Sequence, residues 1–251
     1  MISVERIESG SSWGLRAGTL YIFAMALAIL GPLGALLQRE ILGAVSGPEL
    51  LERLQTSSGM MGAATAVLIL QAAETCAVPV FAFLLTEKLK TAQGLPHFGS
   101  LLGAALLSEV PYDLTVTGEL FRMDSQNPAL GLVVAMLVLY FLKRYGGSIL
   151  IGTAVTAAGL LWVNLLHIRH GSFLLILTVL LWALRDKPLA RSLLGPVAGV
   201  LCSILSPFYL ASPMGFLLVH FSNGEQEEAG PVRYFAYPAI LLTLGLAGVL
   251  L

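Results

Sequence analysis

Long apolar runs separated by short polar segments are the dominant pattern of this sequence. A helix of roughly 20 mostly apolar residues can cross a bilayer, and several of these runs are near the lower limit for spanning. We identify nine runs, at residues 17–37, 59–85, 97–110, 128–142, 148–168, 172–184, 192–206, 208–221 and 234–251. The pattern predicts an all-α fold, a polytopic transmembrane helical bundle with about nine spans. The count falls to eight or seven if a short run fuses with its neighbour or only re-enters the membrane.

The second run, residues 59–85, is longer than one straight span requires. At the helical rise per residue it would be about 40 Å long. Glu74 and Thr75 interrupt its apolar character, and Pro79 removes a backbone donor and clashes with the preceding turn of a helix. We therefore expect this helix to be tilted, kinked or broken near these residues.

The composition supports a membrane protein and excludes several other classes. Hydrophobic residues make up 57% of the chain and charged residues only 12%, against roughly 25% charged residues in a soluble domain. A net charge of −1 gives no reason to expect a nucleic-acid partner. Cys76 and Cys202 lie inside apolar runs and are expected to be buried free thiols, with a disulfide between spans as the alternative. No spacing of Cys and His residues predicts a metal site.

The positively charged residues predict the orientation in the membrane. With nine spans, the residues on the side of the N-terminus are Arg6, Arg16, Lys88, Lys90, Lys143, Arg144, Arg185, Lys187, Arg191 and Arg233. The residues on the other side are Arg39, Arg53, Arg122 and Arg169. The N-terminus is therefore predicted to be cytoplasmic, and residues 1–16 form a lead-in rather than a cleaved signal peptide. The length of the chain fits one helical domain.

Four acids lie in or next to the apolar runs, where a charge is either functional or buried with a partner. Glu74 lies inside a span, where a carboxylate costs at least about 2.5 kcal/mol and has to face the bundle interior, pair or bind a proton. Glu109 and Asp113 lie near a helix end at Pro111, where free carbonyls give an acid no support from the helix dipole. Without a functional role, Glu74 would be an acid at a helix kink that is hydrogen-bonded to a neighbour. Asp113 would be a solvated acid in a loop. Glu87 precedes two lysines, and this pattern is typical of an interfacial helix end.

A basic cluster of His167, Arg169 and His170 lies between two apolar runs. Histidine is the usual general base near neutral pH, although a histidine at the end of a span is often only interfacial. The sequence contains no phosphate-binding loop, nucleophile elbow or zinc-protease motif at useful spacing. The residues by themselves therefore predict a bundle with a few intramembrane acids and do not name a reaction.

Two central motifs resemble those of TraX-type membrane proteins. Residues 79–87, PVFAFLLTE, are similar to the FPxFAFLLxEG stretch of that family, and residues 105–114, ALLSEVPYDL, are similar to its ALxSExPFDL. Three shorter matches to its QN, YNG and FYPxHL patterns are Gln126-Asn127, Asn223-Gly224 and Tyr237-Pro238. Because the order and spacing hold over most of the chain, the resemblance implies a single TraX-like domain over residues 1–251.

The resemblance implies an acyltransferase of the bacterial cytoplasmic membrane. The family's named activity is N-acetylation of the pilin subunit in conjugation, with acetyl-CoA as donor. Since many relatives occur without a pilus, the acceptor is expected to be a peptide or another component of the cell envelope. Membrane lipid is the other expected partner, and the oligomeric state is not indicated. The candidate catalytic residues are Glu109, Asp113 and His170. The candidate substrate-binding residues are Glu74, Glu87, Asn127, Asn223 and Tyr237.

The chain departs from the TraX pattern at several polar positions. In the first span, Gly31-Pro32 replaces the family's Asp-His, and before FPxF Glu74-Thr75 replaces its Gly-Arg. Near the sixth span, Arg169-His170-Gly171 replaces its Asp-Tyr-Gly, and Ile240 replaces its last His. Acyl transfer to an amine or hydroxyl needs a base, so Glu109 or His170 would have to replace the missing histidine. Three interpretations remain. The protein is an acyltransferase with a site rebuilt around Glu74, Glu109 and His170, or it is a non-catalytic scaffold that binds a lipid, peptide or partner. The third interpretation is a small proton-coupled transporter. No inverted repeat is visible to support the transporter.

Overall fold

The computed structural model describes residues 14–43, 52, 54–223 and 230–250, and within these ranges the chain forms helices and no strand. The predicted all-α fold is confirmed. The α-helices are α1 (Ala17–Leu37), α3 (Ser58–Thr75), α4 (Ala77–Thr91), α5 (Phe98–Leu107), α6 (Glu109–Val116), α7 (Pro128–Tyr145), α8 (Ile149–Leu165), α9 (Gly171–Ala183), α10 (Pro188–Leu201), α11 (Pro213–His220) and α12 (Ala236–Leu250). The shorter helical segments are the π-helix η1 (Gln38–Leu42) and the 3-10 turns η2 (Cys202–Ile204), η3 (Pro207–Ala211) and η4 (Pro231–Phe235). The predicted lead-in, residues 1–16, lies almost entirely outside the described residues.

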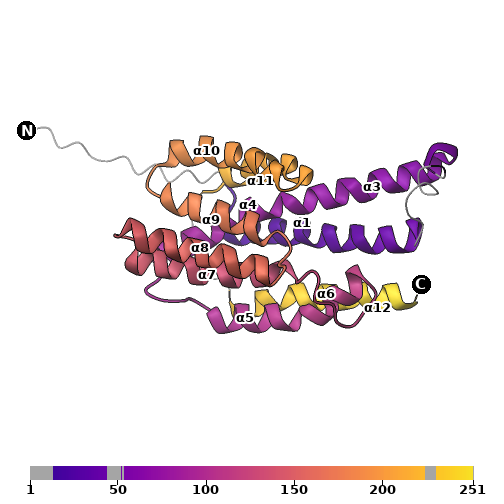
Figure 1. Cartoon of the computed structure of the whole chain (residues 1–251), viewed down its shortest axis with the longest axis horizontal. Coiled ribbons are helices and arrows are strands. Elements are labelled where there is room, and N and C mark those ends of the chain that lie inside the picture. The colour runs from indigo at the N-terminus through magenta and orange to yellow at the C-terminus, as the bar shows by residue number, and fades with distance from the viewer. Residues whose placement is uncertain (1–13, 44–51, 53, 224–229, 251) are drawn as a thin grey trace, which may run out of the picture.

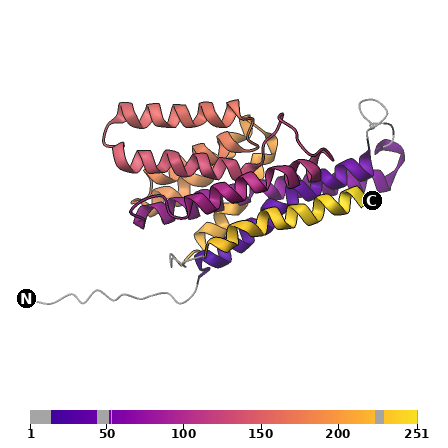
Figure 2. The ribbon, with the colours of Figure 1, turned by 90° about the horizontal axis from the view of Figure 1, so that it is seen from below.

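The helices run broadly along the long axis of the molecule (Figure 1). Helix α1 packs against α3, and α12 packs against α6. These helices extend beyond the rest toward the end of the molecule where the C-terminus lies, whereas α7, α8, α9 and α10 gather over the other part (Figures 1 and 2). Helix α4 contacts α1, α7, α9 and α11, so it is the central helix of this second part. Most of its side chains are buried for that reason.

Four helical segments in the described part of the chain are long and apolar enough to cross a membrane by length and composition: Ala17–Ile41, Ser58–Thr91, Pro128–Tyr145 and Val232–Leu250. Three shorter apolar helices are Ile149–Leu165, Gly171–Ala183 and Pro188–Ile204. Helices with the character of membrane spans are therefore present, but the predicted count of about nine is not confirmed. Several apolar runs fold into helices shorter than the roughly 20 residues of a full span. Residues 208–221 divide between η3 and the short helix α11.

Helices α3 and α4 meet at Cys76, so the long second run is interrupted close to Glu74 and Pro79, as predicted. Helix α11 lies across this break. A Cβ atom added to Gly215 in α11 would lie only 2.1 Å from the carbonyl oxygen of Cys76. The Thr75 hydroxyl donates to the carbonyl oxygen of Phe208 at 3.0 Å and ties the break to η3. The absence of a side chain at residue 215 therefore allows α11 to pack directly on the backbone of the break.

We expect Gly215→Ala to destabilise the protein by about 1–3 kcal/mol, the usual cost of overpacking a close contact. The new methyl group would meet a backbone carbonyl, which cannot rotate away as a side chain can. Thermal unfolding of the detergent-solubilised protein measures the effect as a lower melting temperature. Gly103→Ala in α5 is the matched control, since no atom lies within 4 Å of a Cβ at that position. Equal melting temperatures for the two variants would contradict the close packing of α11.

Both cysteines are buried and free, as predicted from their apolar surroundings. The thiol of Cys76 lies 3.2 Å from the carbonyl oxygen of Ala211, at the same break. Cys202 belongs to the buried apolar cluster that α4 shares with α9 and α11. The two thiols therefore take part in packing within the bundle.

Candidate functional site

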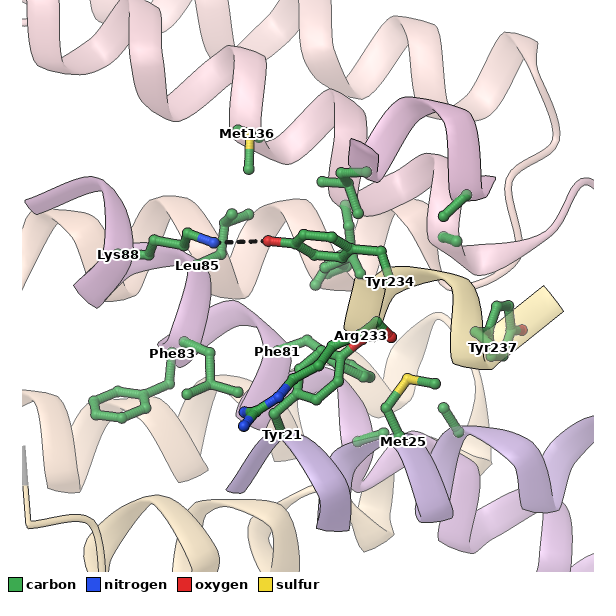
Figure 3. A pocket seen from close by; sticks show the side chains of 18 of the residues that line it. Tyr21, Met25, Phe81, Phe83, Leu85, Lys88, Met136, Arg233, Tyr234 and Tyr237 are labelled. Atoms are coloured by element: carbon green, nitrogen blue, oxygen red, sulfur yellow. Dashed lines mark hydrogen bonds between the residues drawn. The ribbon is translucent and has the colours of Figure 1, made fainter. Parts of the chain in front are cut away.

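A cavity of about 670 Å³ lies within the bundle, between α1, α4, α5, α7, α9 and η4. This volume is in the range of pockets that hold small molecules and cofactors. The wall is mainly apolar, and Figure 3 shows the side chains of Tyr21, Met25, Phe81 and Met136 around it. The cavity is therefore a ligand-sized space with an apolar middle section.

Two groups of polar side chains lie apart in the lining, which also includes Tyr21 and Arg233. One group consists of Glu74, Arg169 and His170, which we call the acid–base cluster. The other lies around Lys88 and Tyr234, which we call the Lys88 end. Glu74 and Lys88 are 14 residues apart in a nearly continuous helical segment, which corresponds to roughly 20 Å. A mainly apolar section thus separates the two groups along one cavity.

Glu74 is the most enclosed member of the acid–base cluster, with only 2% of the residue exposed. The Arg169 guanidinium donates from Nη2 to Glu74 Oε2 at 2.7 Å, and Nε2 of His170 lies 3.3 Å from the same oxygen. The other carboxylate oxygen, Oε1, has no hydrogen-bond partner among the described residues. One oxygen of Glu74 is therefore held by two basic side chains, and the other is buried in the cavity wall without a described partner.

Arg169 and His170 lie in the turn between α8 and α9, outside the candidate spans. Burial by itself would lower the pKa of Arg169, but the adjacent Glu74 carboxylate outweighs burial and raises the pKa above its ordinary value. Arg169 therefore remains cationic and balances the buried carboxylate.

His170 has a left-handed backbone conformation, with φ of 57°, directly before α9. Its Nδ1 atom lies 3.0 Å from the hydroxyl of Tyr209, whose ring stacks on Phe173 with a centroid distance of 4.0 Å. With Glu74 near Nε2 and Tyr209 near Nδ1, both ring nitrogens have partners. Such contacts fix the orientation of an imidazole and select its tautomer.

Helix α1 places Gly31 against the acid–base cluster. A Cβ atom added to Gly31 would lie 2.0 Å from both Cδ and Oε2 of Glu74, so any side chain there would overlap the carboxylate. The Glu74 carboxylate therefore fills the volume that a side chain from α1 would otherwise occupy.

Three other candidate residues lie in a second polar cluster, where α5 and α6 meet the start of α7. The side-chain amide of Asn127 donates to Glu109 Oε2 at 3.0 Å, while its oxygen accepts from the Ala129 N–H and caps α7. Asp113 accepts from the backbone N–H of Arg122 at 2.7 Å, and burial raises the pKa of its carboxyl group. Among the described residues, the lining of the cavity does not include Glu109, Asp113 or Asn127. In this geometry they hold the loop between α6 and α7, and their catalytic and binding roles stay predictions.

The remaining candidates lie at different distances from the cavity. Glu87 lines it and pairs with the Arg191 guanidinium, and Tyr237 lines it as a buried side chain. Asn223 is not among the lining residues. Its backbone N–H donates to the carbonyl oxygen of Leu15 at 3.1 Å and joins the end of the α11 segment to the start of α1. The structure therefore brings Glu74, Glu87, His170 and Tyr237 to one cavity.

A comparison with known protein families gives one match. The model described as TraX protein matches residues 55–247, which extend from the segment before α3 into α12 and make up most of the chain. The chain belongs to the TraX family. Comparisons with curated proteins and with solved structures gave no match.

The departures from the TraX motifs now have a spatial meaning. By the resemblance, Glu74-Thr75 takes the place of the TraX Gly-Arg, and Arg169 takes the place of its Asp. These two departures are in contact, since the Arg169 guanidinium pairs with the Glu74 carboxylate. The TraX Asp expected at position 31 is likewise replaced by glycine, and the Glu74 carboxylate fills the space beside it.

Sequence reasoning did not identify Arg169, Lys88, Tyr209 or Tyr234 as site residues. For Arg169 a signal was present, because it belongs to the basic cluster with His167 and His170 and departs from the TraX pattern. Lys88 stands where the FPxFAFLLxEG motif ends in glycine, whereas no motif or spacing indicated that Tyr209 and Tyr234 lie near the cavity.

Proposed function

We propose that this TraX protein is an acyltransferase of the bacterial cytoplasmic membrane. It transfers an acyl group, such as acetyl, from acyl-CoA to an amine or hydroxyl acceptor. The observation that carries the proposal is the acid–base cluster in the wall of a cavity of about 670 Å³, with one oxygen of Glu74 free of described partners. Pockets of this size with a few convergent polar groups are the usual form of a substrate site.

The acid–base cluster has the groups that acyl transfer requires. The acceptor nitrogen or oxygen attacks the thioester carbonyl carbon, and Glu74, supported by His170, takes the acceptor's proton. The C–S bond then breaks, and the same proton is returned to the departing thiolate. Arg169 carries further N–H donors that can stabilise negative charge on the carbonyl oxygen in the transition state.

Tyr209 is a positioning residue in this proposal. It is not among the residues that line the cavity, but its hydroxyl contacts Nδ1 of His170. By holding that nitrogen it keeps Nε2 directed at Glu74, the group that accepts the proton. The stacking on Phe173 supports the orientation of the tyrosine ring.

The experiment that tests the proposal measures free thiol released from acetyl-CoA by the full-length protein with a membrane extract as the source of acceptors. We expect His170→Gln to lower kcat by roughly 10²–10⁴-fold, the usual cost of losing a general base or its partner. His167→Gln is the matched control, because this exposed histidine in the same turn does not line the cavity. Absence of turnover in the wild-type protein would favour the non-catalytic scaffold, and equal rates for both variants would overturn the role given to His170.

A further inference from the structure

Lys88 projects its ammonium group into the cavity at the end opposite the acid–base cluster. The residue is half-buried, and its Nζ atom donates to the Tyr234 hydroxyl at 2.7 Å and lies 5.3 Å from the centre of that ring (Figure 3). Within the described ranges of the chain, Lys88 forms no salt bridge with a carboxylate. A half-buried cation whose described contacts are with a neutral side chain has the capacity to bind an anion.

Support of the helix C-terminus does not account for Lys88. A lysine in the last turn of a helix often serves the free carbonyl groups there. At the end of α4 this role belongs to Lys143 of α7, which donates to the carbonyl oxygens of Leu89 at 2.7 Å, Lys90 at 3.1 Å and Ala92 at 2.6 Å. Lys90 pairs with Asp186. The helix end is thus already served by Lys143 and Lys90 is paired elsewhere, while Lys88 faces the cavity.

The contact with Tyr234 brings two hydrogen-bond donors to one place. Because the tyrosine oxygen accepts from Lys88, its O–H proton points elsewhere, and no described residue accepts it. His97 also lines this end, with its ring 6.4 Å from that of Tyr234. The acid nearest in sequence, Glu87, is engaged by Arg191. The Lys88 end therefore presents donors and positive charge to the cavity.

We propose that the Lys88 end is a phosphate subsite, at which Lys88 and the Tyr234 hydroxyl bind a phosphate group of the ligand. Lysine binds phosphate as a point charge, and a neutral hydroxyl donor beside it adds direction. The rest of the ligand extends through the apolar section toward Glu74. If the proposed function holds, on which this assignment of the ligand rests, the phosphate belongs to the CoA part of the acyl donor and the thioester lies at the acid–base cluster.

The subsite is tested by binding of CoA to the full-length protein in neutral detergent, measured by isothermal titration calorimetry. We expect Lys88→Met to weaken CoA binding at least about tenfold, an amount that corresponds to 1.4 kcal/mol. Lys88→Arg should retain most of the affinity because it keeps the charge, and Tyr234→Phe should lose a few-fold. Lys90→Met is the matched control, since Lys90 is two residues away and exposed. Pantetheine, which has the arm and thiol of CoA without the phosphates, should bind equally to all variants.

The outcomes separate the subsite from the proposed function. If Lys88→Met binds CoA as the wild type does, or loses pantetheine binding equally, the subsite is overturned even where acyl transfer is observed. Dioctanoyl phosphatidic acid is the second probe, because a lipid phosphate presents the same chemistry. If it binds in a Lys88-dependent way and CoA does not bind, the subsite stands with a lipid as its source and the acyl-CoA donor is overturned. If neither compound binds in a Lys88-dependent way, the subsite is overturned.

Discussion

The Gly31→Asp variant should lose activity and stability, and the added substitution Glu74→Ala should restore a large part of both. In the single variant the new side chain enters the volume of the Glu74 carboxylate, because even a Cβ at position 31 lies 2.0 Å from it. Overpacking of this kind costs about 1–3 kcal/mol, and two adjacent carboxylates add repulsion. Glu74→Ala removes the overlap and leaves one carboxylate, now supplied by α1, beside Arg169.

Three further measurements test whether the reaction needs a carboxylate at this place, whichever helix supplies it. Glu74→Ala by itself should lower the rate of thiol release from acetyl-CoA by roughly 10²–10⁴-fold, because the base is lost. The double variant Gly31→Asp/Glu74→Ala should regain at least about tenfold of that loss. Gly31→Asn/Glu74→Ala is the control, as it has the same shape without the charge. It should regain melting temperature but no rate, and equal rates for the Asp and Asn double variants would show that the reaction does not need a carboxylate here.

Arg169→Leu should be the most destabilising single substitution in the acid–base cluster. It leaves Glu74, of which 2% is exposed, without its cation, and breaking a buried ion pair in this way typically costs about 3–5 kcal/mol. The expected result is a large fall in the free energy of unfolding, measured by denaturant titration in mixed micelles. Adding Glu74→Gln should recover most of the loss, since the buried charge is then removed as well.

The control for this prediction is an exposed arginine with an acidic partner. Arg122 Nε lies 3.0 Å from Asp124 Oδ2, and the side chains are 44% and 74% exposed. Arg122→Leu should therefore change stability by no more than about 1 kcal/mol. A small effect of Arg169→Leu, similar to that of Arg122→Leu, would mean that water reaches Glu74 and that the pair is not a buried one.

The central TraX motifs drew attention to the acids but did not predict what each acid contacts in the fold. Glu109 and Asn127 belong to matched motifs. The Asn127 amide donates to Glu109, while its oxygen accepts from the Ala129 N–H and caps α7. Glu74 departs from the motif and lies in the wall of the cavity. Of the matched residues, Glu109 and Asn127 thus connect helices, whereas Glu87 and Tyr237 line the cavity together with Glu74.

The sequence by itself determined the helical, membrane-like character of the protein, the break beside Pro79 and membership of the TraX family. These properties follow from the apolar run lengths, the missing N–H of proline and the order of motifs, all of which are local along the chain. Only the tertiary structure decided that Glu74 meets Arg169, 95 residues away, and that Lys88 shares a cavity with Tyr234. Helices that are apolar on all sides carry little information about which face turns inward. The pairing of their few polar residues is therefore set by how the helices pack in space.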